Sequence, residues 1–176
     1  MRADRRHGPV GQAGFFLIEA MVAILIFALG ILGLVAMGGT AVSSQSDAQY
    51  RTEASSLADA IAGEIALGIN RAAGDAGKAA SLAAFAHQPS PTPDTVPAPC
   101  AFSGTAINPA TAPAVAALLD RAANAAGVPG LPGATAANQQ IFIDGAGPFS
   151  RVVITLCWKT ASDSAWRRHT VVTYVN

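Results

Sequence analysis

The side chains that could carry out acid–base, nucleophilic or metal chemistry are few and scattered in this 176-residue chain. The three histidines, His7, His87 and His169, show no metal-ligand spacing to one another or to a cysteine. The sequence contains no phosphate loop, no dinucleotide fingerprint and no Gly-x-Ser-x-Gly nucleophile motif. We therefore expect a protein that is not an enzyme and that holds neither a metal nor a cofactor.

The remaining charged groups favour surface roles. Asp144 and Asp163 lie in stretches typical of turns, where a short carboxylate shapes the backbone. The run Arg167-Arg168-His169 lies in an edge-like strand, where charge keeps other chains from pairing; a contact with a neighbouring subunit is the alternative. Eleven basic residues balance eleven acidic ones, so we expect no nucleic-acid partner.

The one charge in an unusual place is Glu19, near the start of a long apolar run. Residues 15–42 hold 28 residues with Glu19 as the single charge and no proline, which is long enough for a helix to cross a membrane. Three arginines and one aspartate precede this run. A basic flank stays in the cytoplasm, so we expect one membrane span and an exported C-terminal domain.

Three interpretations of the apolar run remain. A cleaved secretory signal would have a small-residue site at 39–41, but the run exceeds the usual 7–15 apolar residues. A plain uncleaved anchor explains the length but not Glu19, since a carboxylate inside a span costs a few kcal/mol. The third interpretation uses the junction Gly14-Phe15-Phe16-Leu17-Ile18-Glu19, which joins the basic leader to the run.

This junction resembles the class III signal of type IV pilins and pseudopilins: a glycine, an apolar residue, and glutamate five positions after the glycine. The resemblance implies that prepilin peptidase cuts on the cytoplasmic side, between Gly14 and Phe15, and removes leader residues 1–14. It also implies N-methylation of Phe15, the new first residue. The anchor would be retained in the inner membrane before the subunit passes into a pilus fibre at the cell surface.

Glu19 then acquires a role in assembly and register. Cleavage creates a charged amine at Phe15, and a buried charge needs a partner. Phe15 and Glu19 are four positions apart, so they can pair within one helix. In the family, the glutamate is thought to meet the amine of a neighbouring subunit and so to set the axial register.

Two further stretches resemble the PilV-type minor pilins. These are Ala-Leu-Gly-Ile-Leu-Gly-Leu at 28–34 and the pattern of Asp59, Ile61, Ala62 and Ile65. The lack of a proline within the span departs from major pilins. The resemblance implies a minor pilin in, or at the tip of, a type IV pilus, supporting assembly and adhesion. The implied partners are prepilin peptidase, other major and minor pilins, the inner-membrane assembly platform and inner-membrane lipid. The alternatives are a minor pseudopilin of type II secretion and a single-span anchored periplasmic binding domain.

The elements that must position these groups form an α+β, pilin-like fold. Apolar residues recur every three or four positions from Tyr50 to Ile69, so one helix is expected from Phe15 to about Asn70. Its half at 15–42 would cross the membrane, and its amphipathic half at 43–70 would pack on a small antiparallel sheet at 140–176. Residues 71–139 are rich in Ala, Gly and Pro and predict loops with short helices at 78–87 and 113–126. Strands are expected at 140–143, 151–159 and 166–175.

Two cysteines, Cys100 and Cys157, lie outside the span. In an oxidising compartment an isolated pair is typically bonded, and closing this loop stabilises the fold by roughly 4 kcal/mol in the chain-entropy model. The bond would tie the proline-rich loop to a central strand. The alternative is two free, buried thiols.

Overall fold

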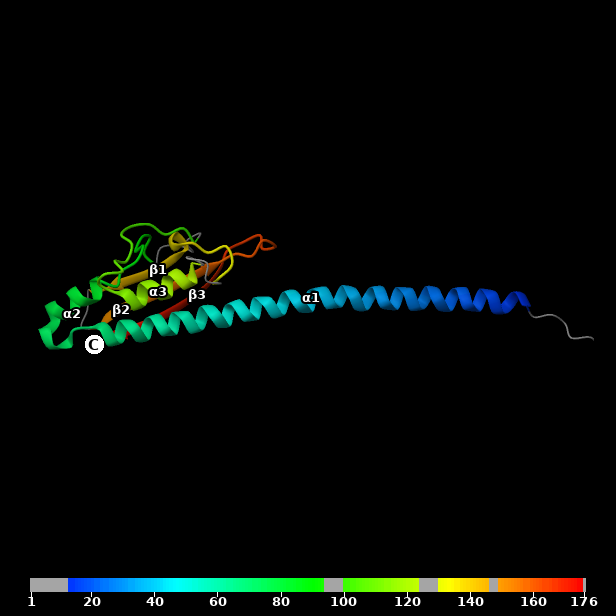
Figure 1. Ribbon diagram of the computed structural model, residues 1–176, viewed down its shortest axis with the longest axis horizontal. Helices are drawn as coiled ribbons and strands as arrows, with labels where there is room; N and C mark the ends of the chain where they lie inside the picture. Colours follow the sequence, from blue (N-terminus) through cyan, green and yellow to red (C-terminus); the bar gives the residue numbers. More distant parts are fainter. Residues whose placement is uncertain (1–12, 94–99, 124–129, 146–148, 176) are drawn as a thin grey trace, which may run out of the picture. The chain divides into compact units, whose positions relative to one another are not determined.

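The fold combines a long N-terminal helix with a small antiparallel sheet, as expected for an α+β protein (Figure 1). In this computed structural model the described residues are 13–93, 100–123, 130–145 and 149–175. The chain divides into two compact units, residues 1–47 and 48–176. The helices and strands are α1 (Ala13–Gly68), η1 (Arg71–Ala73), α2 (Gly74–Ala83), α3 (Pro113–Ala122), η3 (Ala136–Asn138), β1 (Gln139–Asp144), β2 (Ser150–Trp158) and β3 (Arg167–Val175).

Helix α1 is a single helix of 56 residues, and its end is two residues earlier than the sequence predicts. The end falls at Gly68, where a side chain has no room: a Cβ there would lie 2.5 Å from Cζ of the Phe85 ring. Just beyond it, a guanidinium nitrogen of Arg71 donates to the carbonyl of Ala66 at 2.9 Å. That bond satisfies one of the carbonyls that a helix end leaves without a partner.

The sheet has the order β1-β2-β3, and all neighbours are antiparallel. The strands lie within a residue or two of the predicted ones. The predicted helix at 78–87 is wrong in position, because α2 lies at Gly74–Ala83. His87 instead forms a backbone bridge with Ile141, with N–O distances of 3.1 and 2.9 Å, which requires extended backbone there. Helix α3 ends at Ala122, four residues before the predicted end.

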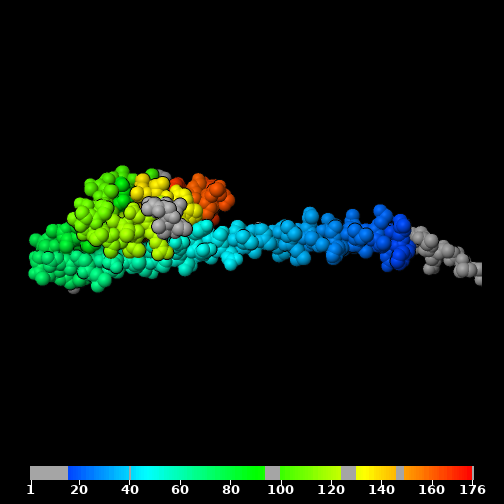
Figure 2. Space-filling model, in the orientation of Figure 1, coloured from blue at the N-terminus to red at the C-terminus, as the bar shows by residue number. Residues whose placement is uncertain are grey.

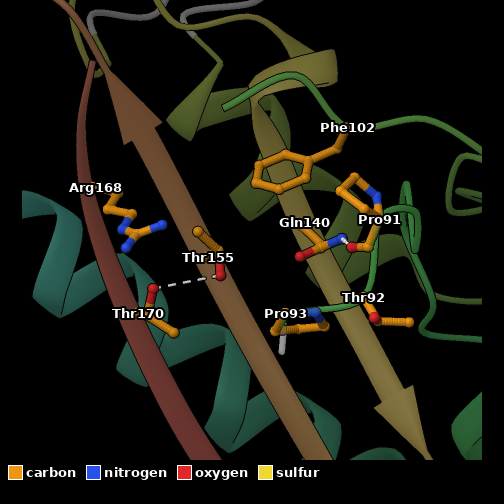
Figure 3. Close-up of a pocket in the computed structure, with 8 residues that line it drawn as sticks. All are labelled: Pro91, Thr92, Pro93, Phe102, Gln140, Thr155, Arg168 and Thr170. Carbon is orange, nitrogen blue, oxygen red and sulfur yellow. Dashed lines mark hydrogen bonds between the residues drawn. The ribbon is translucent and has the colours of Figure 1, made fainter. Parts of the chain in front are cut away.

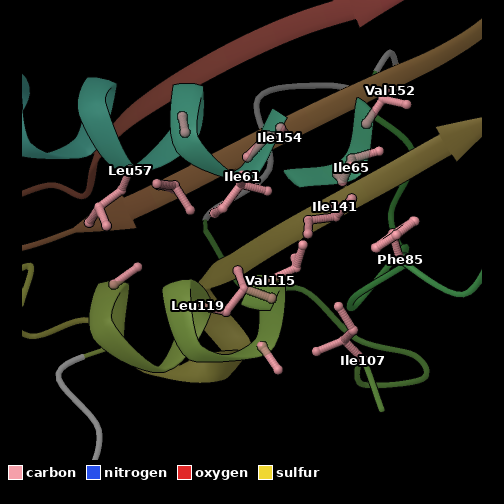
Figure 4. Close-up of a cluster of buried hydrophobic side chains, with 14 of the residues drawn as sticks. Leu57, Ile61, Ile65, Phe85, Ile107, Val115, Leu119, Ile141, Val152 and Ile154 are labelled. Atoms are coloured by element: carbon pink, nitrogen blue, oxygen red, sulfur yellow. The ribbon is translucent and has the colours of Figure 1, made fainter. Parts of the chain in front are cut away.

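One hydrophobic core joins α1, α3 and the inner face of the sheet (Figure 4). From α1 it takes the predicted stripe, in which Leu57, Ile61 and Ile65 are at most 3% exposed. Helix α3 adds Val115 and Leu119. The strands contribute alternate residues, as the pleat requires: Ile141, Val152, Ile154, Leu156 and Trp158.

The central strand β2 is buried on both faces, whereas the alternation in its sequence predicts only one strongly apolar face. On the outer face Val153, Thr155 and Cys157 are at most 6% exposed. Phe102, from the loop that follows α2, packs with Cys157 on that face. The loop therefore acts as a third layer over part of the sheet.

Candidate functional site

The first functional feature is the apolar part of α1. Its most hydrophobic 18-residue window has no buried residue, and the helix is long and apolar enough to cross a membrane. The large apolar side chains between Phe16 and Val42 are 45–77% exposed. Figure 2 shows the side chains on one face of this segment. Water disfavours such a surface, so the segment is suited to lipid or to packing against other apolar helices.

The predicted processing residues lie at the start of this helix. Helix α1 begins at Ala13, which puts the peptide bond between Gly14 and Phe15 in its first turn. Leader residues 1–12 and the side chain of Phe15 lie outside the part that the structure describes. Glu19 is exposed, one helical turn after Phe15, and is the only charged residue between 16 and 46.

The second feature is the predicted disulfide, which the structure confirms. Cys100 and Cys157 are bonded, with their Cα atoms 6.0 Å apart, so the alternative of two free thiols is wrong. The bond joins the loop after α2 to the last part of central strand β2. Phe102 and the partly buried Trp166 pack around it.

Buried side-chain amides hold the backbone on both sides of this disulfide. Asn138 Nδ2 donates to the carbonyl of Cys100 at 2.6 Å. The Gln139 amide pairs with the backbone of Cys157, donating to its carbonyl at 3.1 Å and accepting from its N–H at 3.2 Å. Gln139 is fully buried, so these bonds satisfy both ends of its amide. It extends the hydrogen-bonding ladder between β1 and β2 past the start of β1.

The side-chain amide of Gln140 likewise holds backbone in place, here in the proline-rich part of the loop after α2. Its Nε2 donates to the carbonyls of Gln88 and Pro91, at 3.1 and 2.8 Å. The sequence analysis missed these amides. The sequence does contain a signal for them. Asn138, Gln139 and Gln140 are three successive amides at the start of an apolar strand, and amides that become buried require specific hydrogen-bond partners.

Between this loop and the outer face of the sheet lies a hollow of about 440 Å³, which we call the loop–sheet hollow (Figure 3). Gln140, Thr155 and Thr170 stand in register across its three strands, and the two threonine hydroxyls are 3.4 Å apart. The described residues that line it are Pro91, Thr92, Pro93, Phe102, Gln140, Thr155, Arg168 and Thr170. None of these side chains is a general base or a strong nucleophile at neutral pH, so the hollow is suited to contact rather than bond making.

His87 is buried, and its ring forms hydrogen bonds to two segments distant in the sequence. Its Nδ1 accepts from the N–H of Ile107 at 3.2 Å, so in the neutral ring Nε2 donates to the carbonyl of Ala136 at 3.0 Å. Burial lowers the pKa of His87 below its ordinary value, outweighing the bond to Ala136. The neutral ring thus links the start of the loop after α2 to the segments that contain Ile107 and Ala136.

Asp163 closes the turn between β2 and β3, as the sequence predicts. Arg167 donates twice to its carboxylate, at 2.8 and 3.1 Å, and the hydroxyl and N–H of Thr160 donate at 2.8 and 3.1 Å. The bonds from Arg167, and then those from Thr160, hold the pKa of Asp163 well below its usual range. The basic run is therefore divided: Arg167 serves the turn, while Arg168 lies over the loop–sheet hollow (Figure 3).

The described residues do not bring three His, Cys, Asp or Glu side chains together as a metal site. No family model, curated protein or solved structure matches this chain. The features that bear on its function are the apolar helix, Glu19 and the disulfide-bonded compact unit at 48–176, which we call the head.

Proposed function

We propose that this protein is a non-enzymatic, PilV-type minor pilin. It assembles through its hydrophobic N-terminal helix into, or at the tip of, a type IV pilus and supports pilus assembly and adhesion. One observation carries the proposal: a bare apolar helix holds a single exposed carboxylate, Glu19, five residues after Gly14 at its start. The compact unit at 48–176, which begins with the second half of α1, fits a pilin head.

In this proposal the chain is first a single-pass protein of the inner membrane. Prepilin peptidase removes the leader at Gly14, and Phe15 becomes an N-methylated first residue. The apolar helix then leaves lipid for the core of a fibre made with other major and minor pilins at the inner-membrane assembly platform. Both environments are apolar, so the same exposed surface suits both.

Glu19 gives this transfer its specificity. Inside a bundle of apolar helices, an unpaired carboxylate or amine carries a large desolvation cost. Only registers that bring Glu19 to the amine of a neighbouring Phe15 remove that cost. Wrong registers are thus penalised by several kcal/mol, while apolar packing alone discriminates poorly among them.

The first experiment measures the mature N-terminus by mass spectrometry. We expect a chain that starts at a methylated Phe15. Gly14→Val should block processing, because a branched side chain does not fit a cleft shaped for glycine. Gly11→Val, in the same leader, is the matched control and should be processed normally. A wild-type chain with an intact leader, or one cut near residue 41, would contradict the proposal.

The second experiment compares crude membranes with sheared filaments. Glu19→Gln keeps the side-chain shape but removes the charge, and losing one partner of a buried pair costs about 3–5 kcal/mol, roughly a thousandfold in incorporation. The variant should be inserted and processed normally yet be absent from filaments. Glu64→Gln, in the second half of the same helix, should enter filaments like the wild type. Wild-type incorporation of Glu19→Gln would leave Glu19 as an ordinary residue of a plain anchor.

A further inference from the structure

The loop–sheet hollow brings a cation, hydroxyl groups and an apolar wall together on the outer face of the sheet. Gln140, Thr155 and Thr170 form its floor, one from each strand. Phe102 and the proline-rich loop form its wall, and the guanidinium of Arg168 points toward Thr155 (Figure 3). Its volume of about 440 Å³ lies within the range of small-molecule sites in proteins.

Arg168 is the only charged side chain among the described residues of this lining. It is exposed and makes no ion pair or hydrogen bond with the described residues, whereas its neighbour Arg167 donates twice to Asp163. A guanidinium presents several N–H donors in one plane, which match the two oxygens of a carboxylate. The hollow therefore offers one positive charge to a ligand with a single carboxylate.

The threonine pair on the floor leaves one hydroxyl proton for a ligand. The two oxygens of Thr155 and Thr170 are 3.4 Å apart, and either can donate to the other. Two hydroxyls carry two protons, and their mutual bond uses one of them. When Thr155 is the donor, the exposed Thr170 has its proton free for a molecule in the hollow.

Gln140 contributes an acceptor. Its Nε2 donates to the loop carbonyls of Gln88 and Pro91, which fixes the orientation of the amide. Its Oε1 makes no hydrogen bond with the described residues and points toward β2, across the floor (Figure 3). A simple carboxylate has no donor for this oxygen, whereas a hydroxylated acid has both donors and acceptors.

We propose that the loop–sheet hollow binds a uronic acid, a sugar with one carboxylate, either free or within a polysaccharide. Arg168 binds the carboxylate, and the two threonines and Gln140 bind ring hydroxyl groups. The C–H groups of the sugar ring pack on Phe102 and the prolines of the loop. This proposal stands on the head alone and does not require the chain to be a pilin.

A titration followed by nuclear magnetic resonance tests the site. Full-length, nitrogen-15-labelled protein, in a detergent that carries no sugar, is titrated with sodium glucuronate, glucose or sodium acetate at constant ionic strength. We expect glucuronate to shift and saturate the side-chain amide signals of Gln140, with a dissociation constant of roughly millimolar order. Glucose lacks the charge and acetate lacks the hydroxyls, so each should bind at least about tenfold more weakly. A glucuronate shift that does not saturate, or equal binding of acetate, overturns the proposal.

Two substitutions at exposed positions sharpen the test. Arg168→Gln should weaken glucuronate about tenfold, because a charge-assisted bond is lost, and Arg121→Gln on α3 is its matched control. Thr170→Val keeps the shape but removes the hydroxyl, and should weaken binding about fivefold. Its control is Thr173→Val, on the opposite face of β3. Wild-type affinity in Arg168→Gln overturns the proposal.

A trisaccharide of uronic acid separates the two sources of the ligand. Tighter binding than the monomer identifies a polysaccharide, and equal or weaker binding identifies a free sugar acid.

The last variant concerns the chain's own carboxylates. Asp94 follows Pro93 in the sequence and lies outside the described residues. We expect Asp94→Asn to bind glucuronate like the wild type. Binding that appears only in this variant would mean that Asp94 itself occupies the site, and would overturn the proposal.

Discussion

The two halves of helix α1 share one backbone conformation but meet opposite environments. Between Phe16 and Val42 the large apolar side chains are 45–77% exposed, whereas Ala54, Leu57 and Ile61 in the second half are at most 3% exposed. The sequence explains the difference. The first half is apolar on all sides, and the second half confines its apolar residues to one stripe. The first half therefore exposes an apolar surface that is unfavourable in water, whereas the second half packs its apolar stripe into the core of its own head.

The comparison can be tested most strongly by removing the disulfide, which lies wholly in the head. Replacing both Cys100 and Cys157 by alanine should lower the free energy of unfolding of the head by about 4 kcal/mol, since the closed loop restricts the unfolded chain. Denaturant unfolding in detergent, followed by tryptophan fluorescence, measures this. Reduction of the wild type should give the same loss. A loss under about 1 kcal/mol would mean that the amides hold the loop without the bond.

The next test compares one apolar residue in each half. Ile61→Ala leaves a cavity at a fully buried position and should cost about 2–5 kcal/mol of head stability. Leu32→Ala, at a position 72% exposed, should leave the thermal melting of the head unchanged. Equal effects of the two substitutions on head melting would show that the halves are not independent.

The features that the sequence predicted are those set by local pattern. The apolar stripe of α1, the three strands and the disulfide follow from helical spacing, period-two alternation and an isolated cysteine pair. The loop over the outer face of β2 did not follow, because its position depends on Asn138, Gln139 and Gln140, whose partners are 18 to 52 residues away. Single side-chain contacts at such separations leave no periodic signal.

The third test uses acidity and again concerns the head alone. Because burial lowers the pKa of His87, the folded head holds it neutral while the unfolded chain takes up a proton more readily. Stability should therefore be complete above the ordinary histidine pKa and fall as the pH drops through the lowered value. His87→Gln should flatten this part of the pH profile of melting. The helicity of residues 16–42, which contain no histidine, should not respond.

The smallest expected effect belongs to the ion pair between α1 and α3. Arg121 Nη2 lies 3.8 Å from Glu53 Oε1, and the arginine side chain is 54% exposed. Solvent and salt screen such a pair, so Arg121→Gln should cost at most about 1 kcal/mol, and less in high salt. Chemical denaturation at low and high ionic strength measures both quantities. Asp75→Asn, which removes the fully exposed partner of the Lys78–Asp75 pair within α2, is the control. A salt-independent loss of several kcal/mol would show instead that Arg121 packs its stem against α1, and that polar contacts, not the apolar stripe alone, fix α3 to the second half of the helix.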